Sequence, residues 1–167
     1  ANWEREINRW LVRDNFRVYV GEIPSTIDVP ESRTIVSIVG VEQCRDSEVQ
    51  ASAARFLQSG TSCFIGDEMH RTKNARAQQT RAILGDVREP VPAKQGGIQA
   101  HAKYVLLLTG TPIVNGRPIE MWPLLRTCDP ATWTSWRTFY HRYCGGSPTG
   151  AANLEELATK ARSSCMI

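Results

Sequence analysis

Two adjacent carboxylates follow an apolar stretch near the middle of the sequence. Residues 62–66 are small or apolar, and Asp67, Glu68, Met69 and His70 come directly after them. In open α/β sheets, ligands bind at the carboxyl ends of the strands. One carboxylate at such an end can hold Mg²⁺ through its waters, and its neighbour can orient or deprotonate an attacking water. The pattern therefore indicates a hydrolytic phosphate site. The alternative is an acidic turn followed by a surface histidine.

A second apolar stretch, residues 104–108, ends in the sequence Thr-Gly-Thr-Pro at 109–112. Taken alone, this pattern is typical of a strand that stops at a proline turn. Beside the acidic segment, it favours a second part of the same site, because neighbouring parallel strands end at one edge of a sheet. We therefore expect 62–66 and 104–108 to be parallel strands, with Asp67 and Thr109 at the same edge.

The elements that must position these residues alternate along the chain. Apolar or β-branched runs predict strands at 16–20, 34–39, 62–65 and 104–108, of which the last is expected to be the most buried. Helical spacing predicts helices at 2–12, 47–57, 75–84, 117–126, 132–142 and 153–163, with a loop over 86–100. Short apolar strands alternating with helices indicate an α/β fold, with a parallel sheet covered on both faces.

Composition limits the class of protein. The 167 residues fit one domain of ordinary size, 41% of them are hydrophobic, and the net charge of +3 permits contact with an anionic polymer without indicating one. The five cysteines form no CxxC pair, which favours a reduced, intracellular protein. The longest apolar run, 105–108, is too short to span a membrane, and the charged opening is unlike a signal peptide.

The order of the motifs resembles the SWI/SNF-type ATPases of helicase superfamily II. Asp67 to His70, followed by Lys73 and Asn74, is similar to the DEAH-like motif of that family. Residues 106–115 (LLLTGTPIVN) resemble the third motif, and 118–125 resemble the helix after it. The resemblance assigns no role to Lys73 and Asn74.

Flanking segments extend the resemblance over nearly the whole chain. Residues 2–11 are similar to the stretch after motif Ia, and 139–144 (FYHRYC) and 150–157 (GAANLEEL) look most like the annealing-helicase subgroup and its bacterial and viral relatives. The resemblance implies the P-loop NTPase fold, with a RecA-like parallel sheet flanked by helices. Residues 1–167 would form part of the first RecA-like lobe of a helicase-like translocase.

The resemblance also implies a role for each motif residue in binding and hydrolysing ATP. Asp67 would coordinate Mg²⁺, and Glu68 would position the hydrolytic water. His70 would link the γ-phosphate side of the site to the third motif. The segment that would couple hydrolysis to movement on DNA comprises Thr109, Gly110 and Thr111.

One part of the family pattern does not occur in the sequence. No G-x-x-x-x-G-K-[ST] is found in the 167 residues, and the second RecA-like lobe is not represented. We therefore expect a RecA-like fold that is incomplete at both ends, and no ATP turnover by this chain alone. Because the strand that precedes a phosphate loop lies inside the sheet in this family, we also expect a gap beside the strands or an exposed apolar edge.

Several other residues have two interpretations. The tryptophans could form a platform for stacking bases, but their helical spacing favours packing in the core or between lobes: Trp3, Trp10, Trp122, Trp133 and Trp136. His101 is expected in a loop and His141 on a solvated helix face. Cys63 is expected to be a small buried hydrophobe.

The favoured interpretation is an ATP-dependent translocase lobe that acts on double-stranded or branched DNA together with a second RecA-like lobe. It would be intracellular, in the cytoplasm if the protein is bacterial or viral and in the nucleus if it is eukaryotic. A truncated or degenerate lobe that only binds a partner is the alternative. The retained Glu68 argues against degeneration. An RNA helicase is disfavoured by the Thr-Gly-Thr triplet, where RNA helicases of this superfamily more often carry Ser/Thr-Ala-Thr.

Overall fold

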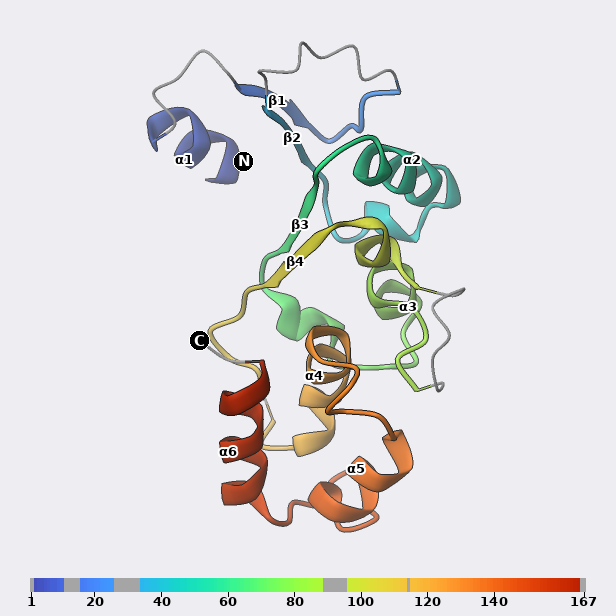
Figure 1. Ribbon diagram of the computed structural model, residues 1–167, viewed down its shortest axis with the longest axis vertical. Coiled ribbons are helices and arrows are strands. Elements are labelled where there is room, and N and C mark those ends of the chain that lie inside the picture. Colours follow the sequence, from blue (N-terminus) through green and yellow to red (C-terminus); the bar gives the residue numbers. More distant parts are fainter. Residues whose placement is uncertain (1, 11–15, 26–33, 89–95, 114, 166–167) are drawn as a thin grey trace.

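The computed structural model describes residues 2–10, 16–25, 34–88, 96–113 and 115–165. The elements follow one another along an elongated molecule (Figure 1). Helix α1 (Asn2–Trp10) and strands β1 (Phe16–Val20) and β2 (Thr34–Ile38) lie at one end. Strands β3 (Cys63–Gly66) and β4 (Tyr104–Leu107) lie near the middle, and three helices form the other end.

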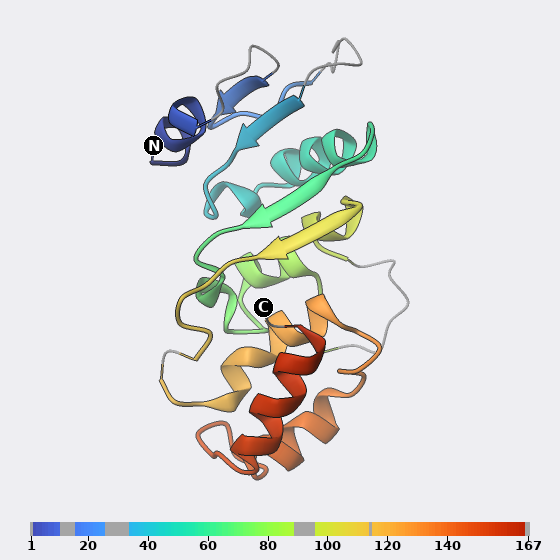
Figure 2. The same ribbon diagram turned by 60° about the vertical axis from the view of Figure 1, so that its left-hand side comes forward.

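The strands form two parallel pairs. β1 pairs with β2 from Phe16↔Thr34 to Val20↔Ile38. β3 pairs with β4 from Cys63↔Tyr104 to Gly66↔Leu107, and Figure 2 shows the arrowheads of β2, β3 and β4 pointing to the same side. The predicted parallel pairing of 62–66 with 104–108 is therefore confirmed. A single continuous RecA-like sheet is not formed by the described residues, whose two sheets have two strands each.

One face of the β3–β4 pair is uncovered. Residues two apart on a strand share a face, and Cys63 and Ile65 with their partners Tyr104 and Leu106 are all exposed. Ile65 is 52% exposed and Leu106 41%. The predictions of a buried strand at 104–108 and of a buried Cys63 were therefore wrong. The sequence predicted a gap beside these strands or an exposed apolar edge, whereas these exposed residues lie on a face of the pair, so that prediction is not tested by them.

Helix α2 (Ser47–Gln58) lies between β2 and β3 in the sequence, and helix α3 (Gln78–Leu84) lies between β3 and β4. Helix α2 begins where the carboxylate of Asp46 accepts a hydrogen bond from the backbone N–H of Glu48, at 2.7 Å. This is a standard N-cap. Helix α3 begins three residues later than predicted, because Asn74 closes a turn at 74–77 instead. It ends at Gly85, whose φ of 77° favours glycine.

Nearly all the buried hydrophobic residues form one cluster that runs from Cys44 to Ala161, and its aromatic part lies among the last three helices. These are α4 (Trp122–Cys128), α5 (Trp136–Cys144) and α6 (Leu154–Ser164). The ring of Phe139 lies between Trp122 and Trp133, with centroids 5.1 and 5.9 Å away, in the tilted and edge-on arrangements that aromatic pairs prefer. Trp122 and Trp133 are buried, as the packing interpretation predicted.

The first helix behaves differently. No residue of α1 is buried, and Trp3 and Trp10 are 41% and 68% exposed. These two tryptophans therefore do not pack in a core of the described residues, and their packing against a second lobe stays a prediction. Among those residues, no helix combines the length and apolar character needed to cross a bilayer.

Candidate functional site

The acidic segment leaves β3 through a tight turn. Gly66 is buried, and a Cβ at this position would lie 2.5 Å from Sδ of Met69, so glycine makes room for that side chain. Glu68 has φ 51° and ψ 43°, a left-handed conformation that is uncommon outside glycine. Such strain persists where the surroundings impose it, often at functional sites. Here it lets Met69 turn into the core while both carboxylates remain exposed at the strand end.

Asp67 is oriented by two hydrogen bonds. Its Oδ1 accepts from the backbone N–H of Glu68 at 2.9 Å, and its Oδ2 accepts from the indole N–H of Trp3 at 2.8 Å. The sequence analysis did not place Trp3 at this site, because the contact joins residues 64 positions apart. Each oxygen of an ionised carboxylate can accept more than one bond, so Asp67 retains acceptor capacity.

The two predicted motifs meet at His70. Its Nδ1 lies 3.1 Å from Oε2 of Glu68 and 3.5 Å from Oγ1 of Thr109. The same Thr109 hydroxyl accepts the backbone N–H of Thr111 at 3.2 Å. Gly110 lies between them, exposed and with nothing within 4 Å of where a Cβ would be. One histidine therefore touches both the acidic segment and the Thr-Gly-Thr loop.

Backbone hydrogen bonds beyond the strands hold this arrangement in register. The N–H of Leu108 donates to the carbonyl oxygen of Gly66 at 2.7 Å, and the N–H of Met69 donates to the carbonyl oxygen of Leu108 at 3.0 Å. The pairing thus continues past the ends of β3 and β4. As a result, Asp67 and Thr109 leave the same edge of the strand pair, as the sequence predicted.

The side chains at this edge fit a magnesium ion. Two adjacent carboxylates and a hydroxyl are hard oxygen ligands, and Mg²⁺ commonly uses one or two carboxylates while keeping several waters. Within the described ranges, no three His, Cys, Asp or Glu residues gather into a cage that could hold a metal. Asp67 and Glu68 are therefore oxygen ligands of the kind that Mg²⁺ uses in proteins.

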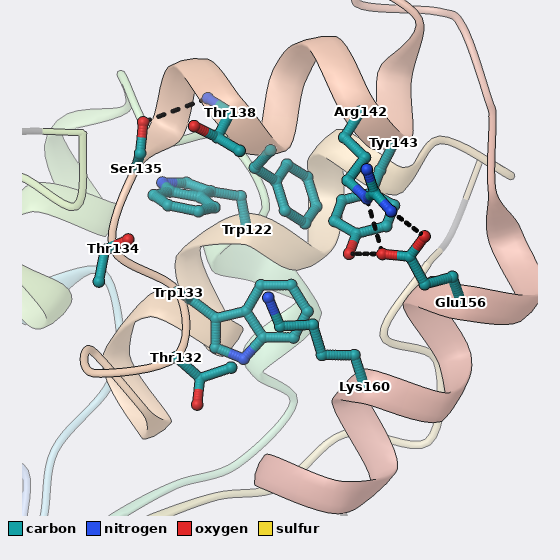
Figure 3. A pocket seen from close by; sticks show the side chains of 11 residues that line it. Trp122, Thr132, Trp133, Thr134, Ser135, Thr138, Arg142, Tyr143, Glu156 and Lys160 are labelled. Carbon is teal, nitrogen blue, oxygen red and sulfur yellow. Dashed lines mark hydrogen bonds and ion pairs between the residues drawn. The ribbon is translucent and has the colours of Figure 1, made fainter.

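A separate hollow of about 300 Å³ lies among α4, α5 and α6, and none of its lining residues belongs to the two motifs (Figure 3). Both of its cations are engaged. Arg142 forms an ion pair with Glu156 at 2.6 Å, and the ammonium of Lys160 lies 4.7 Å from the centre of the Trp133 ring. Arg142 and the hydroxyl of Tyr143 both donate to Glu156 and hold the pKa of that carboxyl at about 2, below its usual 4.5. These contacts join α5 to α6.

Comparison with known proteins identifies the family of the chain. The profile of the SNF2-related domain matches residues 1–162. The chain belongs to this SNF2-related family. The resemblance seen in the sequence is therefore confirmed, and the domain is a helicase-like one whose relatives include chromatin-remodelling proteins.

The relatives of this SNF2-related chain are much longer proteins. Chromodomain-helicase-DNA-binding protein 1 of Gallus gallus is 27% identical over 164 residues, covering 93% of this chain and 8% of the relative. The DNA annealing helicase and endonuclease ZRANB3 of Bos taurus is 26% identical over 175 residues, covering 93% and 14%. Protein CHROMATIN REMODELING 5 of Arabidopsis thaliana is 25% identical over 174 residues, covering 97% and 9%. The chain thus spans about a tenth of the length of these relatives.

Proposed function

We propose that this SNF2-related chain supplies the hydrolytic edge of an ATP-dependent DNA translocase, and that the intact ATPase acts on double-stranded or branched DNA. The observation that carries the proposal is the position of His70, which contacts both Glu68 and Thr109. A histidine in this position would move when the Glu68 carboxylate moves, and so would shift the Thr-Gly-Thr loop. A binding module has no need of such a contact between an acidic motif and a second loop.

Each residue of the two motifs would have its own role in ATP hydrolysis. Asp67 would hold Mg²⁺, which supplies neutralising charge for the phosphates of ATP. Glu68 would orient and deprotonate the attacking water, and its ring contact with His70 would keep the carboxylate at the strand end. Thr109 and Thr111 would couple the site to DNA, and the second RecA-like lobe would close over the nucleotide.

Three variants test the proposal. They are made in the full-length protein, because the assay requires a phosphate loop to bind ATP. Glu68→Gln keeps the shape but removes the base, so ATP binding should persist while hydrolysis falls about 10²–10⁴-fold. Asp67→Asn should weaken Mg²⁺-dependent ATP binding as well as turnover. Thr109→Ala combined with Thr111→Ala should leave much of the basal rate and remove DNA stimulation.

The measurements are ATP affinity, basal rate and DNA-stimulated rate for each variant. Hydrolysis by Glu68→Gln near the wild-type rate would show that the acidic motif is structural. A partner-binding module without catalysis would then be the better interpretation. RNA stimulation in place of DNA stimulation would instead support an RNA helicase.

A further inference from the structure

A buried carboxylate lies behind the two motif loops. Glu120 belongs to the 3₁₀ turn Pro118–Met121 just before α4 and is only 6% exposed. It accepts the backbone N–H of Asn115 at 3.0 Å and the side-chain amide of Asn115 at 2.5 Å. The ammonium of Lys73 lies 3.8 Å from its Oε1. Burial removes water from the carboxylate, and hydrogen bonds and an opposite charge must replace it. These contacts therefore hold Glu120 in a defined position.

The partners of Glu120 come from the ends of the two motifs. Lys73 follows the 3₁₀ turn Met69–Thr72 that contains His70, and its N–H donates to the carbonyl oxygen of His70 at 3.2 Å. Asn115 lies four residues after Thr111. One carboxylate therefore joins the turn that carries the acidic motif to the loop that carries Thr109 and Thr111.

The carboxylate itself is attached to a rigid part of the molecule. Two residues after Glu120, the buried Trp122 donates its indole N–H to the carbonyl oxygen of Val87 at 2.8 Å and packs against Phe139. By contrast, the direct side-chain contact between the motifs, from Thr109 to His70, is 3.5 Å long, and the backbone bond from Met69 to Leu108 fixes only the base of the Thr-Gly-Thr loop. That distance is at the limit for a hydrogen bond. The side-chain connection through Glu120 therefore has more partners than the contact of Thr109 with His70, and Glu120 is more deeply buried than His70.

We propose that Glu120 is a positioning residue, which through Lys73 and Asn115 fixes the Thr-Gly-Thr loop relative to the acidic turn. Movement of one loop is then transmitted to the other. This inference rests on the proposed function and extends it, because it gives Lys73 a role in coupling. Glu120 touches neither nucleotide nor DNA in this scheme.

The test uses the full-length protein and compares Glu120→Gln with a matched control. Glutamine keeps the shape and one acceptor for Asn115 but removes the charge that faces Lys73. The control is Glu156→Gln, which removes the carboxylate of the separate ion pair with Arg142. We expect Glu120→Gln to leave the KM for ATP and the basal rate within about twofold of wild type and to lower the DNA-stimulated rate about tenfold, since hydrogen bonds to charged groups are strong. Glu156→Gln should change none of these quantities.

Lys73→Met provides an independent variant, because Lys73 is partly exposed and its substitution threatens the core less. It should also lower the DNA-stimulated rate. Because the two residues act through one pair, combining Lys73→Met with Glu120→Gln should lose no more stimulation than the stronger single variant. In the 167-residue chain, amide hydrogen exchange at Asn115 should be faster in Glu120→Gln and unchanged in Glu156→Gln.

The outcomes separate this inference from the proposed function. Unchanged DNA stimulation in Glu120→Gln, or losses that multiply in the double variant, would overturn the inference and leave the proposed function standing. An equal fall of the basal and stimulated rates would also overturn it, because Glu120 would then only maintain the fold. A wild-type protein without DNA-stimulated hydrolysis would refute both.

Discussion

Gly97 is predicted to stabilise the fold, because a larger residue would not fit at this position. Gly97 precedes the 3₁₀ turn Ile98–His101 and lies against the end of α3. A Cβ at Gly97 would lie 2.3 Å from the carbonyl carbon and oxygen of Ile83 and 2.5 Å from the backbone nitrogen of Gly85. These are backbone atoms of a helix end, so they cannot swing aside as a flexible side chain would.

The size of the effect follows from this geometry. To reach ordinary contact, α3 and the 97–101 turn must separate by roughly 1 Å, and overpacking of this kind costs about 1–3 kcal/mol. The reduced freedom of alanine in the unfolded chain offsets about 0.4–1 kcal/mol. We therefore expect Gly97→Ala to lower the free energy of unfolding by about 0–2.6 kcal/mol, with a mid-range value of about 1.3 kcal/mol that corresponds to a fall in Tm of about 3–5 °C.

The assay is urea unfolding of the 167-residue chain, followed by the fluorescence of its buried tryptophans. Gly60→Ala is the matched control, because nothing lies within 4 Å of a Cβ there and its φ is outside the left-handed region. The control should unfold at or slightly above the wild-type midpoint. If Gly97→Ala and Gly60→Ala unfold at the same urea concentration, the close approach of α3 to Gly97 is wrong.

Two further predictions concern pH and solubility. Because the folded pKa of Glu156 is about 2 against 4.5 unfolded, its pairing with Arg142 stabilises the fold above about pH 4.5, and this contribution is lost as the pH falls toward 2. The difference in urea midpoint between wild type and Glu156→Gln should therefore be larger at pH 7 than at pH 3, and an equal difference at both would contradict this. Leu106→Lys should reduce self-association of the chain in light scattering, because Leu106 and its neighbour Ile65 are apolar and exposed. More association than in wild type would show that this face does not drive it.

Local patterns were sufficient to predict most elements and the meeting of the two motifs. Within the described residues, the β-branched and apolar runs predicted the four strands, because such side chains fit a pleated, half-buried surface. The placement of Asp67 and Thr109 at one edge followed from parallel pairing alone. The family could be identified in the same way, since its motifs are short, contiguous and ordered along the chain.

The sequence by itself therefore determined which strands carry the two motifs, and it proposed which residues at their ends would do the chemistry. Only the tertiary structure decided which faces are covered and which distant side chains meet. Cys63 and Leu106 look like core residues, yet they are exposed, because burial depends on what packs over a strand. The pairing of Glu120 with Lys73 has no local signal, since it depends on the path of the chain between β4 and α4. A side chain's neighbours along the chain set its conformation, but its partners across space are set by packing of the whole domain.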